Sequence, residues 1–291
     1  MNPVGTDTSP MQPNRNGKHD DHNGGKTTLD IYSDHDIPLS CENRNTEVFQ
    51  MLLKDGRLDP SADDNCIIKL ASAKGHAEIV QLLLKHDRVD PSAADNCAIK
   101  SASAEGHTEI VKLLLKDVRV EPAADDNYCI RVACENGHTD IVRVLLKNKR
   151  VDPSAKSNFA IRLASEKGKT EVVKILLNDE RVDPSALENY PIRYASANGY
   201  TEIVKLLLKD ERVDPCTYNN YALRFACKYG FTEIVRMLLK DERINPSADG
   251  FFAIRIASKN GHIELVRMLL EDRRVDRSAY DSLIANITTR I

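Results

Sequence analysis

The sequence repeats itself every 31 residues without a single insertion from residue 60 to residue 261. A fixed period of roughly 20–50 residues is typical of solenoids, propellers and repeat arrays rather than of ordinary globular domains. Glycine and proline mark the period, and both residues interrupt helices and strands. The glycine column consists of Gly75, Gly106, Gly137, Gly168, Gly199, Gly230 and Gly261, and the proline column of Pro60, Pro91, Pro122, Pro153, Pro184, Pro215 and Pro246.

Apolar residues between these columns have helical spacing. In the second half of one unit, Ile110 and Val111 are followed by Leu114 and Leu115, at i+4 and i+5 from Ile110. This spacing predicts one face of a short amphipathic helix. Helices of about nine residues are marginal alone in water, so units of this size must gain their stability by stacking.

The first half of each unit predicts a second kind of helix. Ile99 is followed at i+3 and i+4 by Ala102 and Ser103, whose small side chains allow another helix to approach closely. We expect the glycine column to end this helix, because the residue just past a helix end commonly has positive φ, which glycine adopts easily.

These units resemble ankyrin repeats. The segment 106–115 is similar to the second-helix signature of that family, and the segment 98–103 stands where the family has Pro-Leu-His-x-Ala-Ala. The resemblance implies an all-α, ankyrin-like solenoid of stacked helix-turn-helix units joined by loops or short hairpins. The usual period of the family is about 33 residues, so we expect shallower projections here. Two other repeat families fit less well. Tetratricopeptide repeats lack so long a loop, and leucine-rich repeats need an L-x-L strand that is absent here.

The repeat also predicts the organisation of the chain. Residues 61–277 form seven full units, and 36–60 read as a degenerate N-terminal unit whose second helix spans Thr46 to Lys54. Residues 278–291 supply a C-terminal half-unit. Residues 1–35 contain only six apolar residues, and we expect a disordered tail.

Composition excludes several classes of function. The chain has 41 Lys+Arg and 44 Asp+Glu, a formal net charge of −3, so binding to nucleic acid is not expected. No run reaches the roughly 18 apolar residues of a membrane span. Seven cysteines in so long a chain make a poor disulfide framework, and we expect Cys66 and Cys97 to stay reduced. A monomeric cytoplasmic protein is predicted, with a nuclear location left open.

Two basic columns admit two interpretations. One column has a residue in the loop of every unit, from Arg57 to Arg274. The other has a residue on every first helix, from Lys69 to Arg255. They could form a ladder that binds phosphate or an acidic peptide. We favour a structural role in which the long side chains bond loop carbonyls and carboxylates, because acidic residues accompany every basic column.

No group of residues has the pattern of a catalytic or cofactor site. The run His19-Asp20-Asp21-His22 lacks further ligands nearby for a metal, and Gly25-Lys26-Thr27 lacks the first glycine of a phosphate loop. The histidines that follow the glycine column have no paired acid or nucleophile. The sequence predicts a protein that is not an enzyme and that holds no cofactor and no metal.

Aromatic residues are unevenly distributed. Ten of the fifteen Phe and Tyr residues lie between positions 190 and 252. Their i, i+4 spacing predicts one stripe across two adjacent helices. The stripe consists of Tyr190 and Tyr194 on one helix and Tyr221, Phe225 and Tyr229 on the next.

The columns to which these aromatic residues belong indicate their burial. Tyr194 and Phe225 share a column with apolar residues such as Leu70, which favours a core position. Tyr218 and Tyr229 stand in columns that hold charged residues elsewhere, so both are expected to be exposed. Exposed tyrosine is a common interface anchor.

The sequence therefore predicts a non-enzymatic scaffold that binds another protein. The resemblance implies a concave surface built from loop tips and the exposed side of each first helix. Two alternatives remain open: a nucleic-acid or polyanion binder that uses the basic columns, and an adaptor subunit of a larger enzyme. The residues predicted to bind the partner are Leu187, Ala197, Asn198, Tyr218, Lys228 and Tyr229.

Overall fold

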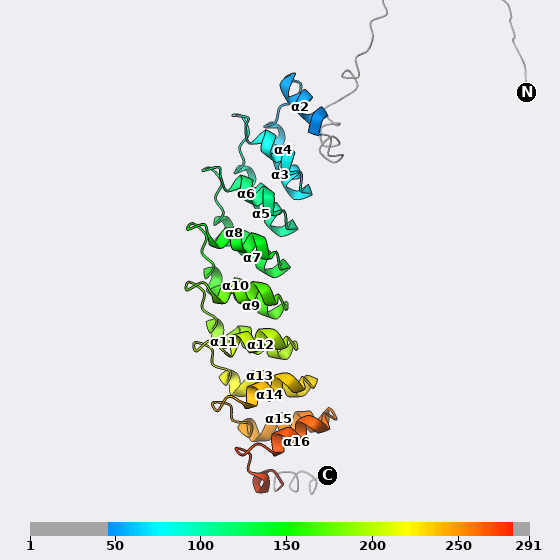
Figure 1. The fold of residues 1–291 in the computed structure, drawn as a ribbon, viewed down its shortest axis with the longest axis vertical. Helices are drawn as coiled ribbons and strands as arrows, with labels where there is room; N and C mark the ends of the chain where they lie inside the picture. Colours follow the sequence, from blue (N-terminus) through cyan, green and yellow to red (C-terminus); the bar gives the residue numbers. More distant parts are fainter. Residues whose placement is uncertain (1–45, 282–291) are drawn as a thin grey trace, which may run out of the picture.

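The computed structural model describes residues 46–281, and these residues form paired helices stacked into a solenoid (Figure 1). The first helices of the seven units are α3 (Ala62–Lys74), α5 (Ala93–Glu105), α7 (Ala124–Asn136), α9 (Ala155–Glu166), α11 (Ala186–Ala197), α13 (Thr217–Tyr229) and α15 (Ala248–Lys259). The second helices are α4 (Ala77–Leu83), α6 (Thr108–Leu114), α8 (Thr139–Leu146), α10 (Thr170–Leu177), α12 (Thr201–Leu207), α14 (Thr232–Leu239) and α16 (Ile263–Leu270). The predicted all-α solenoid is confirmed.

The ends of the chain are described only in part. Helix α2 (Thr46–Lys54) spans the residues predicted for the second helix of the N-terminal unit. The predicted tail over 1–35, residues 36–45 of that unit and residues 282–291 of the C-terminal half-unit lie outside the described residues.

The helices lie in two rows. Each first helix packs on the first helix of the next unit, and each second helix packs on the next second helix. The stack forms an arc with the inter-unit loops along its outer edge (Figure 1). The loops therefore do not lie on the concave side, where we expected them. The loop between units is longer than the turn at the glycine column, so the loop edge occupies more space. We call the surface made by the row of first helices the first-helix face.

The core lies between the two rows. Ile110, Val111 and Leu114 are at most 1% exposed, and Ala102 and Ser103 of the first helix are fully buried beside them. Because these small side chains recur at the same place, adjacent units can pack closely along the whole stack. Within residues 46–281 there is no strand, so loops rather than hairpins join the units.

The glycine column has the predicted backbone conformation. Gly106 has φ of 84°, and the other six glycines of the column also lie in the left-handed region. The residues that follow six of these glycines, from His107 to His262, each cover the glycine of the preceding unit. The His138 ring covers Gly106 and its Nε2 lies 2.9 Å from the carbonyl oxygen of Ala104. These histidines therefore have a structural role.

Each first helix begins with three residues of positive φ, a turn that the sequence did not lead us to expect. At 156–158 the third residue is Asn158, which is buried and accepts a 2.7 Å hydrogen bond from the backbone N–H of Asp183 in the next unit. Arg162 donates to the carbonyl oxygens of Lys156 and Ser157 at 3.0 and 2.9 Å. These hydrogen bonds offset the cost of left-handed backbone, about 1–2 kcal/mol per residue. The three positive-φ residues, hereafter the left-handed turn, recur at the start of every first helix, but the hydrogen bonds vary: Phe251 replaces the asparagine in α15, and Asn220 in α13 donates to the carbonyl oxygen of Asn245.

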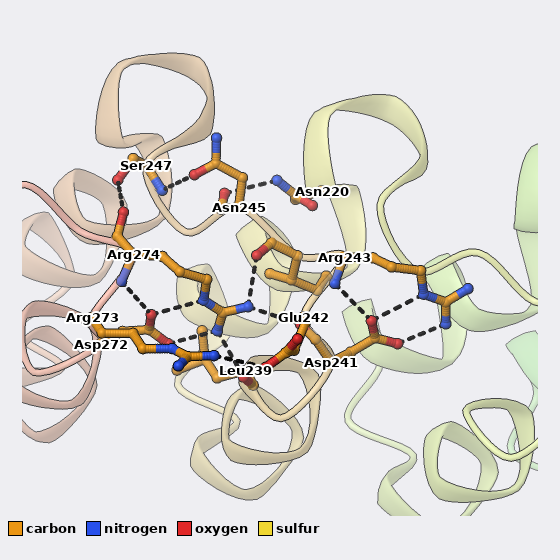
Figure 2. Close-up of polar contacts among 11 residues, drawn as sticks. Asn220, Leu239, Asp241, Glu242, Arg243, Asn245, Ser247, Asp272, Arg273 and Arg274 are labelled. Carbon is orange, nitrogen blue, oxygen red and sulfur yellow. Dashed lines mark hydrogen bonds and ion pairs between the residues drawn. The ribbon is translucent and has the colours of Figure 1, made fainter.

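The loop arginines join consecutive loops. In Figure 2, Arg274 makes a bidentate pair with Asp272, at 2.8 and 2.6 Å, and donates to the carbonyl oxygens of Leu239 and Ile244 in the preceding unit. Arg243 repeats the pattern with Asp241 and the carbonyl of Val213. Both basic columns direct donors to carbonyls and carboxylates inside the chain, as the structural interpretation predicts, but only the loop arginines reach the neighbouring unit's carbonyls regularly.

Candidate functional site

The six residues predicted to bind a partner lie on α11 and α13 or at their ends. Leu187 and Tyr218 occupy the left-handed turns that begin the two helices, with φ of 50° and 52°. The other four lie at the opposite ends of these helices, next to the glycine turns. Three of the six side chains are large, apolar and about half exposed: Leu187 at 51%, Tyr218 at 54% and Tyr229 at 50%.

Aromatic rings connect the two ends of the site. Tyr190 stacks on Tyr194 with ring centroids 3.9 Å apart, and Tyr221 stacks on Phe225 at 4.0 Å. Both pairs have the i, i+4 spacing that brings side chains together on one helix face. Further contacts at 5.9–6.2 Å join Tyr194 to Tyr221 and continue from Phe225 through Tyr229 to the second helix. We call this set the aromatic strip; it consists of Tyr190, Tyr194, Tyr218, Tyr221, Phe225, Tyr229 and Phe231.

Arg193 holds the strip together at its loop end. Its guanidinium lies 4.2 Å from the ring centroid of Tyr218 and 5.4 Å from that of Tyr221. Its Nε and one terminal nitrogen donate to the carbonyl oxygens of Glu188 and Leu187 at 2.9 and 3.0 Å. Arg193 is only 8% exposed. A buried charge needs such compensation, and ring faces and carbonyl oxygens both supply it.

A shallow hollow lies at the other end of the strip, between α11 and α13. Its volume is about 410 Å³, and three of the six predicted residues, Ala197, Asn198 and Tyr229, line it. Ala197 leaves room there because it is small where the next unit has Lys228, and the ring of Phe231, which lines the hollow, covers Gly199. The remaining walls are aromatic: Tyr194, Tyr221, Phe225 and Phe231.

Polar groups surround the hollow. Asn198 donates through its side-chain nitrogen to the carbonyl oxygen of Glu166, at 3.0 Å. The Glu166 carboxylate accepts a hydrogen bond from the Tyr190 hydroxyl. The Lys228 ammonium lies 5.0 Å from the ring centroid of Tyr229 and 5.4 Å from that of Phe225, while the side chain stays exposed. The site is thus an apolar surface with hydrogen-bonding and cationic groups at its edge.

Three tyrosines of the strip, Tyr190, Tyr218 and Tyr221, have a raised pKa and are neutral at physiological pH. Burial and the hydrogen bond to Glu166 raise the pKa of Tyr190, and a hydrogen bond to Glu188 raises that of Tyr218. Burial also raises the pKa of Tyr221. These hydroxyls therefore serve as hydrogen-bonding groups rather than as acids or bases, which suits recognition better than proton transfer.

The interpretation of Tyr194 and Phe225 as core residues is wrong. Both are half-buried members of the strip. Their column is apolar except for Ser101, yet Leu70, at the same position of the first full unit, is also only half-buried. The column lies on the first-helix face beside the core, so apolar character there does not require full burial.

Sequence reasoning missed Arg193 and the column that begins with Tyr128. In that column Tyr128, Phe159 and Tyr190 alternate with arginines, so that Arg131 lies 5.8 and 5.4 Å from the first two ring centroids. Arg162 similarly lies 5.3 Å from both of its neighbouring rings. The sequence did contain a sign of this alternation: in successive units an aromatic residue is followed three positions later by a basic one.

The described residues offer little for covalent or metal chemistry. Within 46–281 no three His, Cys, Asp or Glu side chains are grouped so that they could hold a metal ion. Burial raises the pKa of the Cys129 thiol to about 11 and that of Cys227 to about 12, so both stay protonated and weakly nucleophilic. The run at 19–22 considered for metal binding lies outside the described part. None of the helices between 46 and 281 has the length and apolar character needed to cross a membrane.

Comparison with known proteins gives one kind of match. A family model described as ankyrin repeats (3 copies) matches residues 38–126, 101–188 and 192–281. No curated protein matches the sequence.

Proposed function

Because the chain belongs to the ankyrin-repeat family, whose members generally bind other proteins, we propose that it is a non-enzymatic scaffold that binds a partner protein through the aromatic strip. One observation carries the proposal: exposed aromatic rings and an open hollow coincide on the first-helix face at α11 and α13. Large exposed aromatic residues beside a hollow are typical of interface anchors.

The proposal uses all six predicted residues. Leu187 and Tyr218 would contact the partner at the loop end of the strip, and the other four would contact it around the hollow. Arg193 would act as a positioning residue, because it fixes the ring of Tyr218 without being exposed itself.

Two finer points belong to the same proposal. The described cysteines are all free, which supports a reducing compartment such as the cytoplasm. We also propose that the chain acts as a monomer, since stacked repeats bury their apolar surface against one another and need no second copy for a core.

Site-specific photo-cross-linking tests the proposal. The photoreactive amino acid benzoylphenylalanine is placed at Tyr229 of the full chain, and in a second protein at Lys74, which occupies the same column five units away. We expect a discrete adduct with another protein from position 229 and none from position 74. Adducts of equal yield from both positions, or none from position 229, would contradict the proposed site.

A further inference from the structure

The first-helix face changes its charge along the stack, and this change carries an inference about the partner. We propose that the hollow between α11 and α13 receives an acidic segment of the partner protein, anchored there by a large apolar side chain. The inference rests on the proposed function and adds the chemistry of the ligand to it.

The charge change is visible in the first helices alone. Helices α11, α13 and α15 carry five basic residues and two acidic ones, whereas α3, α5 and α7 carry four basic residues and seven acidic ones. The basic residues of this half are Arg193, Arg224, Lys228, Arg255 and Lys259, and of these Lys228 lies against rings that line the hollow, Phe225 and Tyr229. The total charge of the chain conceals this asymmetry, because the two halves of the face nearly cancel.

The two carboxylates on the basic half are already engaged. Asp249 forms an ion pair with Arg224 at 3.0 Å, and Glu188 bonds the Tyr218 hydroxyl. Among residues 46–281, no carboxylate forms an ion pair with Lys228 or Lys259, and both lysines are exposed. Lys228 thus leaves a positive field at one edge of the hollow, whereas the Glu166 carboxylate near Asn198 is already bonded to the Tyr190 hydroxyl. Such a field favours a segment that carries negative charge and disfavours a basic one.

The hollow itself selects an apolar anchor. Its walls are the rings of Tyr194, Tyr221, Phe225 and Phe231, and its volume of about 410 Å³ exceeds that of any one side chain. Burying a large apolar side chain against rings is favourable, and the Asn198 amide and Tyr229 hydroxyl remain at the rim for the backbone of the segment.

Single-stranded nucleic acid also combines negative charge with apolar faces, but the strip is not built for it. Base stacking needs open ring faces. Here Tyr190 covers a face of Tyr194 and Tyr221 covers a face of Phe225, while Arg193 lies against Tyr218. Each of these contacts removes a ring face that a base would need. A strand that ran toward α3, α5 and α7 would also meet the acidic half of the face.

Selection of peptides tests the inference. Random peptides of about a dozen residues displayed on phage are selected on the immobilised full chain at low salt, and the affinities of enriched peptides are measured by fluorescence anisotropy. We expect enriched peptides with more acidic than basic residues and at least one large apolar side chain. Their binding should weaken about tenfold in Lys228→Glu with Lys259→Glu, and in Tyr229→Ala.

The control is Lys74→Glu, which reverses one charge at the acidic end of the face, half the change of the double variant, and should leave affinity unchanged. Neutral or basic peptides, peptides indifferent to all three variants, or no enrichment would each overturn the inference. Tighter binding of an oligothymidylate of about 20 nucleotides would assign the strip to nucleic acid. If cross-linking at position 229 succeeds but the selected peptides are basic, the proposed function stands and the inferred charge of the ligand is wrong. If cross-linking and peptide selection both fail, the proposed function is wrong as well.

Discussion

The loop arginines differ in the residue that stands two positions before them. Asp117 pairs bidentately with Arg119, with contacts of 3.0 and 2.6 Å. The equivalent position of the next unit holds Asn148, whose side chain accepts only the backbone N–H of Arg150. The hydrogen bond from Arg119 holds the pKa of Asp117 below its usual value of 3.8. Asp117 thus contributes stability that Asn148 does not.

Replacing Asn148 by Asp should restore the missing pair. We expect Asn148→Asp to raise the free energy of unfolding by about 0.5 kcal/mol at pH 7, because solvent reaches the arginine of such a pair and screens the charges. A carboxylate whose folded pKa is lowered stabilises above its unfolded pKa and loses this effect as pH falls through the folded value. The gain should therefore disappear at about pH 2, and urea denaturation at both pH values measures it. The reciprocal Asp117→Asn should lose a similar amount at pH 7; a gain from Asn148→Asp that persists in acid would refute the ion pair as its cause.

Gly168 combines two constraints that the sequence showed only in part. Its φ is 72°, and a Cβ atom there would lie 2.6 Å from the Tyr200 ring of the next unit. We expect Gly168→Val to destabilise by more than about 1 kcal/mol from the backbone conformation alone, with the ring contact adding to the loss. Gly261, with φ of 74°, has nothing within 4 Å of that position. Gly261→Val should therefore cost less in a urea titration, and equal losses would show that the ring contact is unimportant.

At the scale of elements, the sequence predicted the helices but not the left-handed turns. Helical periodicity is a local signal, and the glycine column marked where each first helix ends. The turns depend on contacts between units, such as the hydrogen bond from the Asp183 N–H to Asn158, which a local pattern does not display. The asparagine column was the available sign, because asparagine tolerates positive φ better than most residues; its members are Asn65, Asn96, Asn127, Asn158, Asn189 and Asn220.

A substitution at Asn127 tests how much the left-handed turn contributes to the free energy of unfolding. Its buried side chain accepts a 2.7 Å hydrogen bond from the backbone N–H of Asp152. We expect Asn127→Ala to cost about 2 kcal/mol or more of unfolding free energy, because it leaves that N–H unpaired and removes a residue suited to positive φ. Asp125→Ala, at a position where another unit already has Ala94, should change stability by less than about 0.5 kcal/mol. Chemical denaturation that gave equal losses for the two variants would contradict the role of the asparagine.

The sequence predicted some features of the candidate site and not others. Exposure of Tyr218 and Tyr229 followed from the charged residues in their columns, because every unit repeats the same environment. The stacking around Arg193 and the hollow did not follow, since both arise from side chains of two units that meet only after stacking. A column with charged members therefore predicts exposure well, whereas an apolar column did not predict the half-burial of Tyr194 and Phe225, and no column predicts contacts between units.

At the scale of the whole molecule, the stack separates stability from recognition. Each unit packs only on its neighbours, so stability is distributed along the arc in Figure 1. Exposed side chains on the first-helix face contribute little to it, and the repeat allows them to vary from unit to unit. The aromatic strip and the change of charge along this face are two examples of such variation between units.

The most direct test of the strip as a binding surface is the affinity of the partner identified by cross-linking, measured by isothermal titration calorimetry. Tyr218→Ala with Tyr229→Ala should weaken binding tenfold or more, because central tyrosine anchors contribute about 2 kcal/mol or more, while the helicity by circular dichroism stays unchanged. The matched pair Asp63→Ala with Lys74→Ala, in the same two columns of the first full unit, should bind like the unaltered chain. Equal affinities for the two double variants would contradict the account, and so would unfolding of the tyrosine pair, because these residues would then belong to the core.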